Sequence, residues 1–201
     1  MVTKLTLSGA LAALVLPPIA IAEPSDREVQ QIIKRDFRAR GQAKMDRLEQ
    51  DSVQRVCTAT NGRPPADLAK QLEADQMKTI AFPSGGMMGN WKAGASIAWS
   101  GQGMQWHEDP KKPSAGGCYN CHQMSPTRTS YGTIGPSLTG FGKKRGNGME
   151  MQKYVYGKIY NAKAYNLCSE MPRFGHTGSL TEAQIKDLTA YLLDPASPVN
   201  Q

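Results

Sequence analysis

The chain has 201 residues, of which 20% are charged and 39% hydrophobic, with a formal net charge of +7 and a pI near 9.3. It is too hydrophobic for a disordered chain, and its glycines and prolines are too scattered for a collagen-like one. Four cysteines are too few for a fold built from disulfides, and three histidines limit multi-histidine metal sites. The length predicts one domain or two.

The N-terminus predicts an export signal over residues 1–22. Lys4 precedes an apolar run over residues 5–16, a double proline follows, and Ala20-Ile21-Ala22 matches a small-residue cleavage site. An uncleaved membrane anchor is the alternative, but it needs roughly 20 uninterrupted apolar residues. Cleavage would leave 179 residues and a charge of +6, because Lys4 is the only charged residue removed. We therefore expect an oxidising, periplasmic location.

Residues 23–89 are predicted to form a helical N-terminal extension. Residues 26–59 are charged and show helical spacing of apolar side chains, and we expect a helix pair broken near Gly41. A turn over residues 61–64 precedes a third helix, whose first turn suits Pro65. We expect the helix pair to lie on the main domain, and nothing catalytic is visible in it.

Residues 90–201 are predicted to form the main domain. A short helix is expected over 91–99, and a second one carries Met149 and Met151. The C-terminal helix is the best specified, because Thr181 and Gln184 form a capping-box pattern and an apolar stripe follows. Short basic clusters at 111–112 and 143–145 are interpreted as solvated loops.

One motif is more specific than any other in the chain. Cys118-Tyr119-Asn120-Cys121-His122 is C-x-x-C-H, the attachment sequence of c-type haem. In this chemistry the thiols of Cys118 and Cys121 form thioethers with the haem vinyl groups, and His122 becomes the proximal iron ligand. A thioredoxin-like C-x-x-C needs a βαβ setting and a zinc site needs a second ligand pair, and neither is evident. We therefore expect one covalent haem c.

Met171 is the predicted distal ligand of the iron. Met124 is too close to His122 to reach the opposite haem face, whereas Met171 lies 49 residues after that histidine in a proline-restricted loop. A methionine packed in a loop is the alternative. Pro136, 14 residues after His122, is predicted to offer its carbonyl to the other ring nitrogen, although a plain turn would also explain it.

Two cysteines and two histidines remain. Cys57 and Cys168 are an even remainder in an oxidising compartment, so a disulfide between the front helices and the methionine loop is plausible. Free thiols or a bond to a partner are the alternatives. His107 is interpreted as a surface residue, and His176 follows the methionine loop.

The order of these motifs resembles a class I cytochrome c, and more narrowly the SoxX family. SoxX is the monohaem cytochrome subunit of the SoxAX complex in bacterial thiosulfate oxidation. The resemblance covers residues 90–200 and is carried by four segments: G-C-Y-N-C-H-Q from Gly117, G-T-I-G-P-S-L from Gly132, G-K-I-Y-N-A from Gly157 and M-P-R-F-G from Met171.

This resemblance implies an all-α, class I cytochrome c-like domain around one covalent haem. It also implies that the catalytic haem belongs to SoxA, the partner subunit, in a complex that conjugates thiosulfate to a cysteine of the carrier SoxYZ. The present chain would accept electrons from SoxA and pass them to a soluble cytochrome c, without being catalytic by itself. Neither nucleic acid nor a membrane anchor is expected.

Three function classes remain open at this point. They are a subunit of a sulfur-oxidising complex, a free electron shuttle unrelated to sulfur oxidation, and a haem sensor in which Met171 ligation is weak or absent. The positive charge is interpreted as a rim that steers an acidic redox partner.

Overall fold

The computed structural model describes residues 24–201, so the predicted signal peptide lies outside the described residues. This part of the chain is helical and holds no β-strand, only an isolated bridge between Arg40 and Ala43. The α-helices are α1 (Asp26–Asp36), α2 (Ser52–Ala59), α3 (Ala66–Lys78), α4 (Trp91–Trp99), α5 (Phe141–Arg145), α6 (Met149–Tyr160) and α7 (Glu182–Leu193). Short 3₁₀ turns span Met45–Leu48, Cys118–Asn120, Ala162–Ala164 and Pro198–Asn200. The predicted all-α fold class is confirmed.

The chain separates into two units between Phe37 and Arg38. In the first, α1 begins with a capping box in which Ser25 and Glu28 exchange hydrogen bonds, and none of its residues is buried. The second unit contains everything from Arg38 onward, so residues 38–89 fold together with the main domain. The domain boundary after residue 89 stays a prediction.

The break between the first two helices is longer than the sequence predicted. Gly41 lies in it with φ +50°, and a Cβ there would come within 2.0 Å of the Trp106 carbonyl oxygen. The helical pattern resumes only at α2, where the Asp51 side chain caps the helix by accepting from the Gln54 amide. Residues 37–51 hold only the 3₁₀ turn Met45–Leu48, because Arg40 and Ala43 pair in a bridge and the Gln42 side chain donates to the carbonyls of Gln105 and Glu108.

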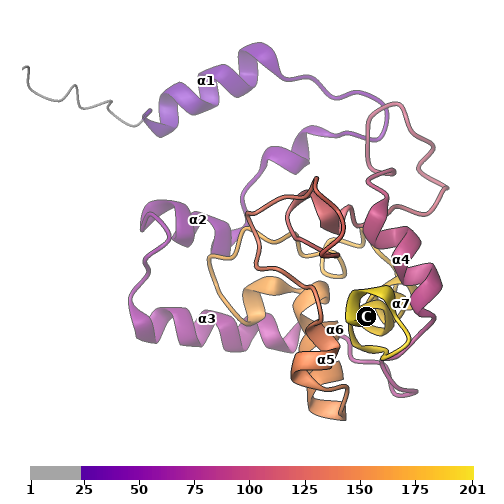
Figure 1. Ribbon diagram of the computed structural model, residues 1–201. Helices are drawn as coiled ribbons and strands as arrows, with labels where there is room; N and C mark the ends of the chain where they lie inside the picture. Colours follow the sequence, from indigo (N-terminus) through magenta and orange to yellow (C-terminus); the bar gives the residue numbers. More distant parts are fainter. Residues whose placement is uncertain (1–23) are drawn as a thin grey trace, which may run out of the picture. The chain divides into compact units, whose positions relative to one another are not determined.

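The core lies where α4 and α6 pack against α7 (Figure 1). The capping box of Thr181 and Gln184 is confirmed, and the predicted stripe of Ile185, Leu188 and Leu192 is buried. α4 has the bounds that its sequence predicted, and it approaches α7 closely at Gly94. A Cβ on Gly94 would lie 2.1 Å from the Asp187 carbonyl oxygen, so only glycine permits this contact.

Residues 143–145 lie in a short helix, α5, and not in the loop that the sequence predicted. Gly140 before it and Gly146 after it both have positive φ, which lets the chain turn sharply at each end. Within residues 24–201, every helix is too short or too polar to cross a bilayer.

Candidate haem-binding site

A single tight turn carries the C-x-x-C-H residues. Gly117 enters it in the left-handed region, with φ +57°, and the Cys118 carbonyl oxygen then accepts from the amides of Cys121 and His122 at 3.1 and 2.9 Å. Neither Cys118 nor Cys121 is in a disulfide. Burial raises the pKa of the Cys118 thiol to about 12. A thioredoxin-like nucleophile needs the opposite shift, so the turn does not fit that alternative.

The His122 ring is fixed by the loop that follows it. Its Nδ1 lies 2.7 Å from the Pro136 carbonyl oxygen. Because a carbonyl can only accept, Nδ1 carries the proton and donates, which leaves the lone pair of Nε2 for a metal. The hydrogen bond predicted from the sequence is therefore present.

Backbone hydrogen bonds connect the attachment turn to the loop over residues 132–138. The amides of Gly132, Gly135 and Leu138 donate to the carbonyls of Tyr119, Cys121 and Gln123, at 2.9, 2.8 and 2.9 Å. Two of these residues must be glycine for steric reasons. A Cβ on Gly132 would lie 1.8 Å from the Asn120 carbonyl oxygen, and one on Gly135 would lie 2.2 Å from Cε1 of His122. The sequence interpretation missed both, although a glycine directly before Pro136 was a visible signal.

Met171 lies on a loop that begins after α6. Its side chain packs against the same core cluster as Cys118, and its amide donates to Ser169 Oγ at 3.2 Å. The far end of the loop is held at α6, where the Tyr160 carbonyl oxygen accepts from the amides of Gly175 and His176 at 3.1 Å each. The loop backbone is therefore attached to α6 after Met171, whereas the contact before it stays within the loop.

Two other methionines have different positions. Met124 is 1% exposed and belongs to the core, so its thioether is packed among other core side chains. Met149, at the start of α6, is 53% exposed.

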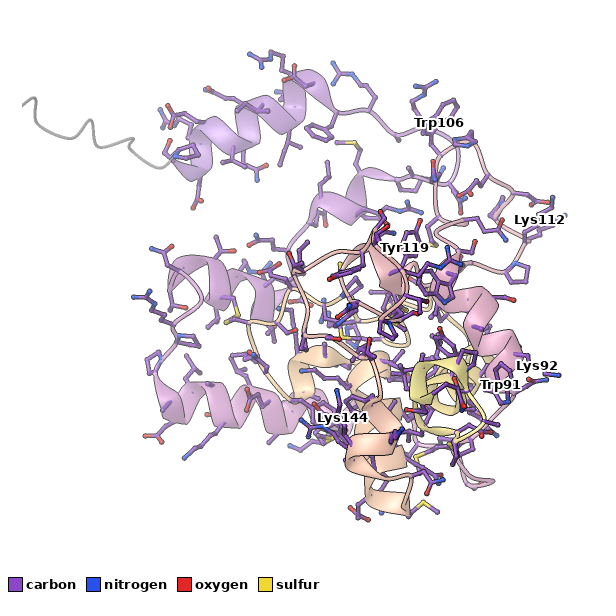
Figure 2. The ribbon with its side chains drawn as sticks, viewed as in Figure 1. Trp91, Lys92, Trp106, Lys112, Tyr119 and Lys144 are labelled. Carbon is purple, nitrogen blue, oxygen red and sulfur yellow. A yellow bond between two sulfur atoms is a disulfide. The ribbon has the colours of Figure 1, made fainter. Side chains whose placement is uncertain are left out.

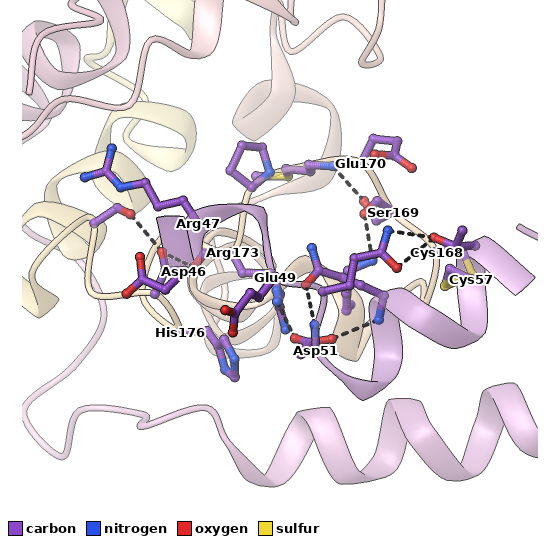
Figure 3. A pocket seen from close by; sticks show the side chains of 18 of the residues that line it. Asp46, Arg47, Glu49, Asp51, Cys57, Cys168, Ser169, Glu170, Arg173 and His176 are labelled. Atoms are coloured by element: carbon purple, nitrogen blue, oxygen red, sulfur yellow. Dashed lines mark hydrogen bonds and ion pairs between the residues drawn. A yellow bond between two sulfur atoms is a disulfide. The ribbon is translucent and has the colours of Figure 1, made fainter. Parts of the chain in front are cut away.

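The predicted disulfide between Cys57 and Cys168 is present, with 5.5 Å between the Cα atoms. It joins α2 to the Met171 loop, and Arg173 of that loop forms an ion pair with Asp51 at 2.5 Å. Figure 3 shows both connections beside a cavity of about 760 Å³. Met171 and His176 line this cavity, but Cys118, Cys121 and His122 do not. It is therefore a feature of the methionine side of the site.

His176 and His107 contribute little to the haem site. His176 lies at the surface. Partial desolvation of its ring and the nearby Arg173 charge lower its pKa, so the ring is neutral near pH 7. His107 is also exposed and packs edge-on against Trp106.

An aromatic cluster that the sequence interpretation missed supports the attachment turn. Tyr119 stacks on Trp99 with 5.5 Å between ring centroids, and Trp99 Nε1 donates to the Tyr191 hydroxyl at 2.8 Å. The Arg128 guanidinium lies 4.8 Å from the Trp99 ring centroid. In Figure 2, Lys92 and Lys112 lie at the right edge of the view, whereas Tyr119 and Lys144 lie over its middle. The cluster links the turn to α4 and α7.

A family model and two known proteins match parts of this chain. Residues 109–194 match the family model of cytochrome c. The chain is 38% identical over 159 residues to a protein of Aquifex aeolicus (strain VF5) described as an uncharacterized lipoprotein, covering 76% of this chain and 73% of that protein. It is also similar to a chain in the crystal structure of SoxXA from P. pantotrophus, with 23% identity and a TM-score of 0.40, over 59% of this chain and 95% of that one.

The helical fold and the C-x-x-C-H turn together define a c-type cytochrome. Residues 109–194 form a cytochrome c domain, and the chain is related to the A. aeolicus protein over most of both lengths. It therefore binds haem c covalently. The residues present fit that group, because the turn offers two cysteines outside any disulfide and a histidine whose Nε2 is left for the iron.

Proposed function

We propose that this protein is a periplasmic monohaem cytochrome that serves as the electron-accepting subunit of a SoxAX L-cysteine S-thiosulfotransferase. It accepts electrons from SoxA and passes them to a soluble cytochrome c, while the transferase chemistry on the carrier SoxYZ takes place at the SoxA haem. Our second candidate is a free class I electron shuttle unrelated to sulfur oxidation.

The observation that carries an electron-transfer role is the hydrogen bond between His122 Nδ1 and the Pro136 carbonyl oxygen. It selects the ring tautomer, orients Nε2 and raises its basicity. If His122 and Met171 both donate to the iron, no position would be left for a substrate, which favours electron transfer over ligand binding.

The chain's own residues would divide this work among them. Cys118 and Cys121 would anchor the group covalently, and His122 and Met171 would donate to its iron beside the core around α7. Haem c, when bound, supplies a one-electron couple between ferrous and ferric iron. A nitrogen and a thioether donor together favour a raised potential.

The Sox assignment is supported by the motifs. The G-P-S-L segment, M-P-R-F-G and the C-terminal helix follow the attachment turn in the order of the SoxX family. The M-P-R-F-G loop is the most specific of these, and its Arg173 and Gly175 both have structural partners.

The periplasmic location is supported by the predicted signal peptide and by the disulfide, which persists in oxidising compartments. The A. aeolicus relative is described as a lipoprotein. Our proposal is a protein without a membrane anchor, so the description of that relative makes the location a point to test. Fractionation of cells should place the protein in the soluble periplasmic extract, and recovery in the membrane pellet would contradict this part.

The axial assignment is tested by visible and near-infrared spectra of the ferric protein. Met171→Ala should abolish the methionine-sulfur-to-iron charge-transfer band, whereas Met149→Ala, which changes an exposed methionine, should leave it intact. An unchanged spectrum in Met171→Ala would remove Met171 as the ligand.

The Sox assignment is tested by affinity purification from cells grown on thiosulfate. Co-purification of a haem-bearing partner with SoxA-type cysteine ligation supports the subunit. Recovery of the chain alone, able to reduce an oxidase, supports the free shuttle.

A further inference from the structure

The Met171 loop has few partners in the main domain. Between α6 and α7 its only regular element is the 3₁₀ turn Ala162–Ala164. Within the loop, Lys163 Nζ donates to the carbonyls of Leu167 and Ser169 at 3.0 and 3.3 Å. A loop of this kind does not by itself set the position of a thioether.

Residues 51–79, comprising α2 and α3 and here called the strap, supply the missing restraints. Its first contact is the ion pair between Asp51 and Arg173 (Figure 3). The Arg173 side chain is only 10% exposed, so this pair is more shielded than the other ion pairs of the described chain. The second contact is the disulfide between Cys57 and Cys168, three residues before Met171.

The remaining contacts come from α3. Glu73 Oε1 accepts from the Leu167 amide at 2.9 Å, which fixes the backbone four residues before Met171. Asn161, which is fully buried at the start of the loop, donates through Nδ2 to Gln76 Oε1 and Thr79 Oγ1 at 3.0 Å each. The strap therefore holds the loop at its start, its middle and directly after Met171.

We propose that the strap is a positioning element for the distal haem ligand, and that Asp51 and the Cys57–Cys168 disulfide act on the iron through the Met171 loop. This inference rests on Met171 as the ligand in the proposed function. It assigns a role to residues 51–79, which the sequence predicted only to pack on the main domain. A bond between iron and a neutral thioether is weak enough that the freedom of the loop decides how often it opens.

Asp51→Asn isolates this role with little change to the helix. Asparagine is as good an N-cap as aspartate, so the cap on α2 is kept while the charge facing Arg173 is lost. Asp75→Asn is the matched control, because Asp75 lies on the same strap and pairs only with the exposed Lys78. The double variant Cys57→Ser/Cys168→Ser removes the second connection.

The experiment uses the full-length ferric holoprotein and two readouts. The first is the rate at which imidazole displaces the distal ligand, followed by the charge-transfer band. Because the Asp51 side chain is 38% exposed and solvent screens its charge, Asp51→Asn should raise this rate about two- to fivefold. The cysteine double variant should raise it as well, and Asp75→Asn should leave it unchanged.

The second readout is hydrogen–deuterium exchange, which does not depend on the identity of the ligand. Asp51→Asn should speed exchange over residues 166–176 while exchange over residues 132–138, on the His122 side, stays as in the parent protein. Unchanged exchange over 166–176 in both Asp51→Asn and the cysteine double variant would overturn the proposal. So would faster exchange with an unchanged imidazole rate, because the strap would then hold the loop without acting on the iron.

The two proposals can fail separately. If Met171→Ala leaves the spectrum unchanged, the ligand assignment fails and the positioning role falls with it, whatever the exchange rates. If Met171→Ala abolishes the band but the strap variants behave as the parent protein, only the positioning role fails.

Discussion

His122 Nδ1 and the Pro136 carbonyl oxygen lie 2.7 Å apart across two loops that are 14 residues apart in sequence. The contact is possible because Gly135, the residue before Pro136, has no side chain to press on the ring. The backbone bond from the Gly135 amide to the Cys121 carbonyl oxygen holds the same glycine against the attachment turn. The orientation of the His122 ring thus depends on a residue that has no side chain of its own.

The Gly135→Ala variant should lose this orientation. Its Cβ would lie 2.2 Å from Cε1 of His122, so either the ring or the loop must move. We expect the free energy of unfolding to fall by about 1–3 kcal/mol, as for overpacked sites, and haem incorporation to decrease. Pyridine haemochrome content and thermal unfolding measure these effects. Gly85→Ala, where a Cβ would meet nothing within 4 Å, is the control and should match the parent protein.

Removal of the disulfide should lower stability markedly. It closes a loop with a sequence separation of 111 residues, so its loss frees much of the unfolded chain. We expect Cys57→Ser/Cys168→Ser to reduce the free energy of unfolding by about 2–5 kcal/mol in urea titrations. A thiol reductant should destabilise the parent protein and leave the double variant unaffected. Equal stability of the two proteins without reductant would contradict a structural role for the disulfide.

The strap should also make stability sensitive to acid. Although burial raises the pKa of Asp51, the hydrogen bonds from Gln54 and Arg173 and the Arg173 charge outweigh it and lower the pKa overall. A lowered folded-state pKa stabilises the protein above the ordinary aspartate range, and this contribution is lost as the pH falls through the folded value. The charges of Lys163 and His176 also act on Asp51. Neither side chain loses positive charge as the pH falls, so neither reverses this effect.

Acid unfolding monitored by circular dichroism tests this expectation. Below about pH 4, the ordinary aspartate range, the parent protein should lose stability more steeply than Asp51→Asn. The difference is modest because the Asp51 side chain is 38% exposed and solvent screens its charge. Parallel acid-unfolding curves for the two proteins would show that the ion pair does not contribute to the pH dependence of stability.

Electron transfer to or from an acidic redox partner should slow as ionic strength rises. The protein is basic, and a Debye length of about 10 Å at 0.1 M salt screens steering between exposed charges. Lys112 and Lys144 lie well apart in Figure 2, so the two basic clusters do not form one patch. We expect Lys143→Glu, which reverses one charge of α5, to lower the second-order rate in stopped-flow measurements.

Lys78→Glu is the control for this charge reversal, because Lys78 already pairs with Asp75 on the exposed face of α3. A rate that does not depend on salt would contradict steering by the basic surface.

Local sequence determined the parts of this protein whose chemistry lies within a few residues. The C-x-x-C-H spacing specified the attachment turn, the capping box of Thr181 and Gln184 specified the start of α7, and the short helix expected over 91–99 is α4. The Pro136 carbonyl was also within reach of sequence reasoning, because a short loop returns to His122. Each of these signals is local, and so the pattern alone was sufficient.

Only the tertiary structure decided the rest, because it depends on residues far apart in the chain. Asp51 is 122 positions from Arg173, and Trp99 is 92 positions from Tyr191, so no spacing rule connects them. The same is true of the interrupted helix at residues 37–51, whose polar side chains bind a loop near residue 105 instead of continuing a helical pattern. The sequence determined which residues can hold a haem, and contacts between distant residues decided how α2, α3 and α7 pack around them.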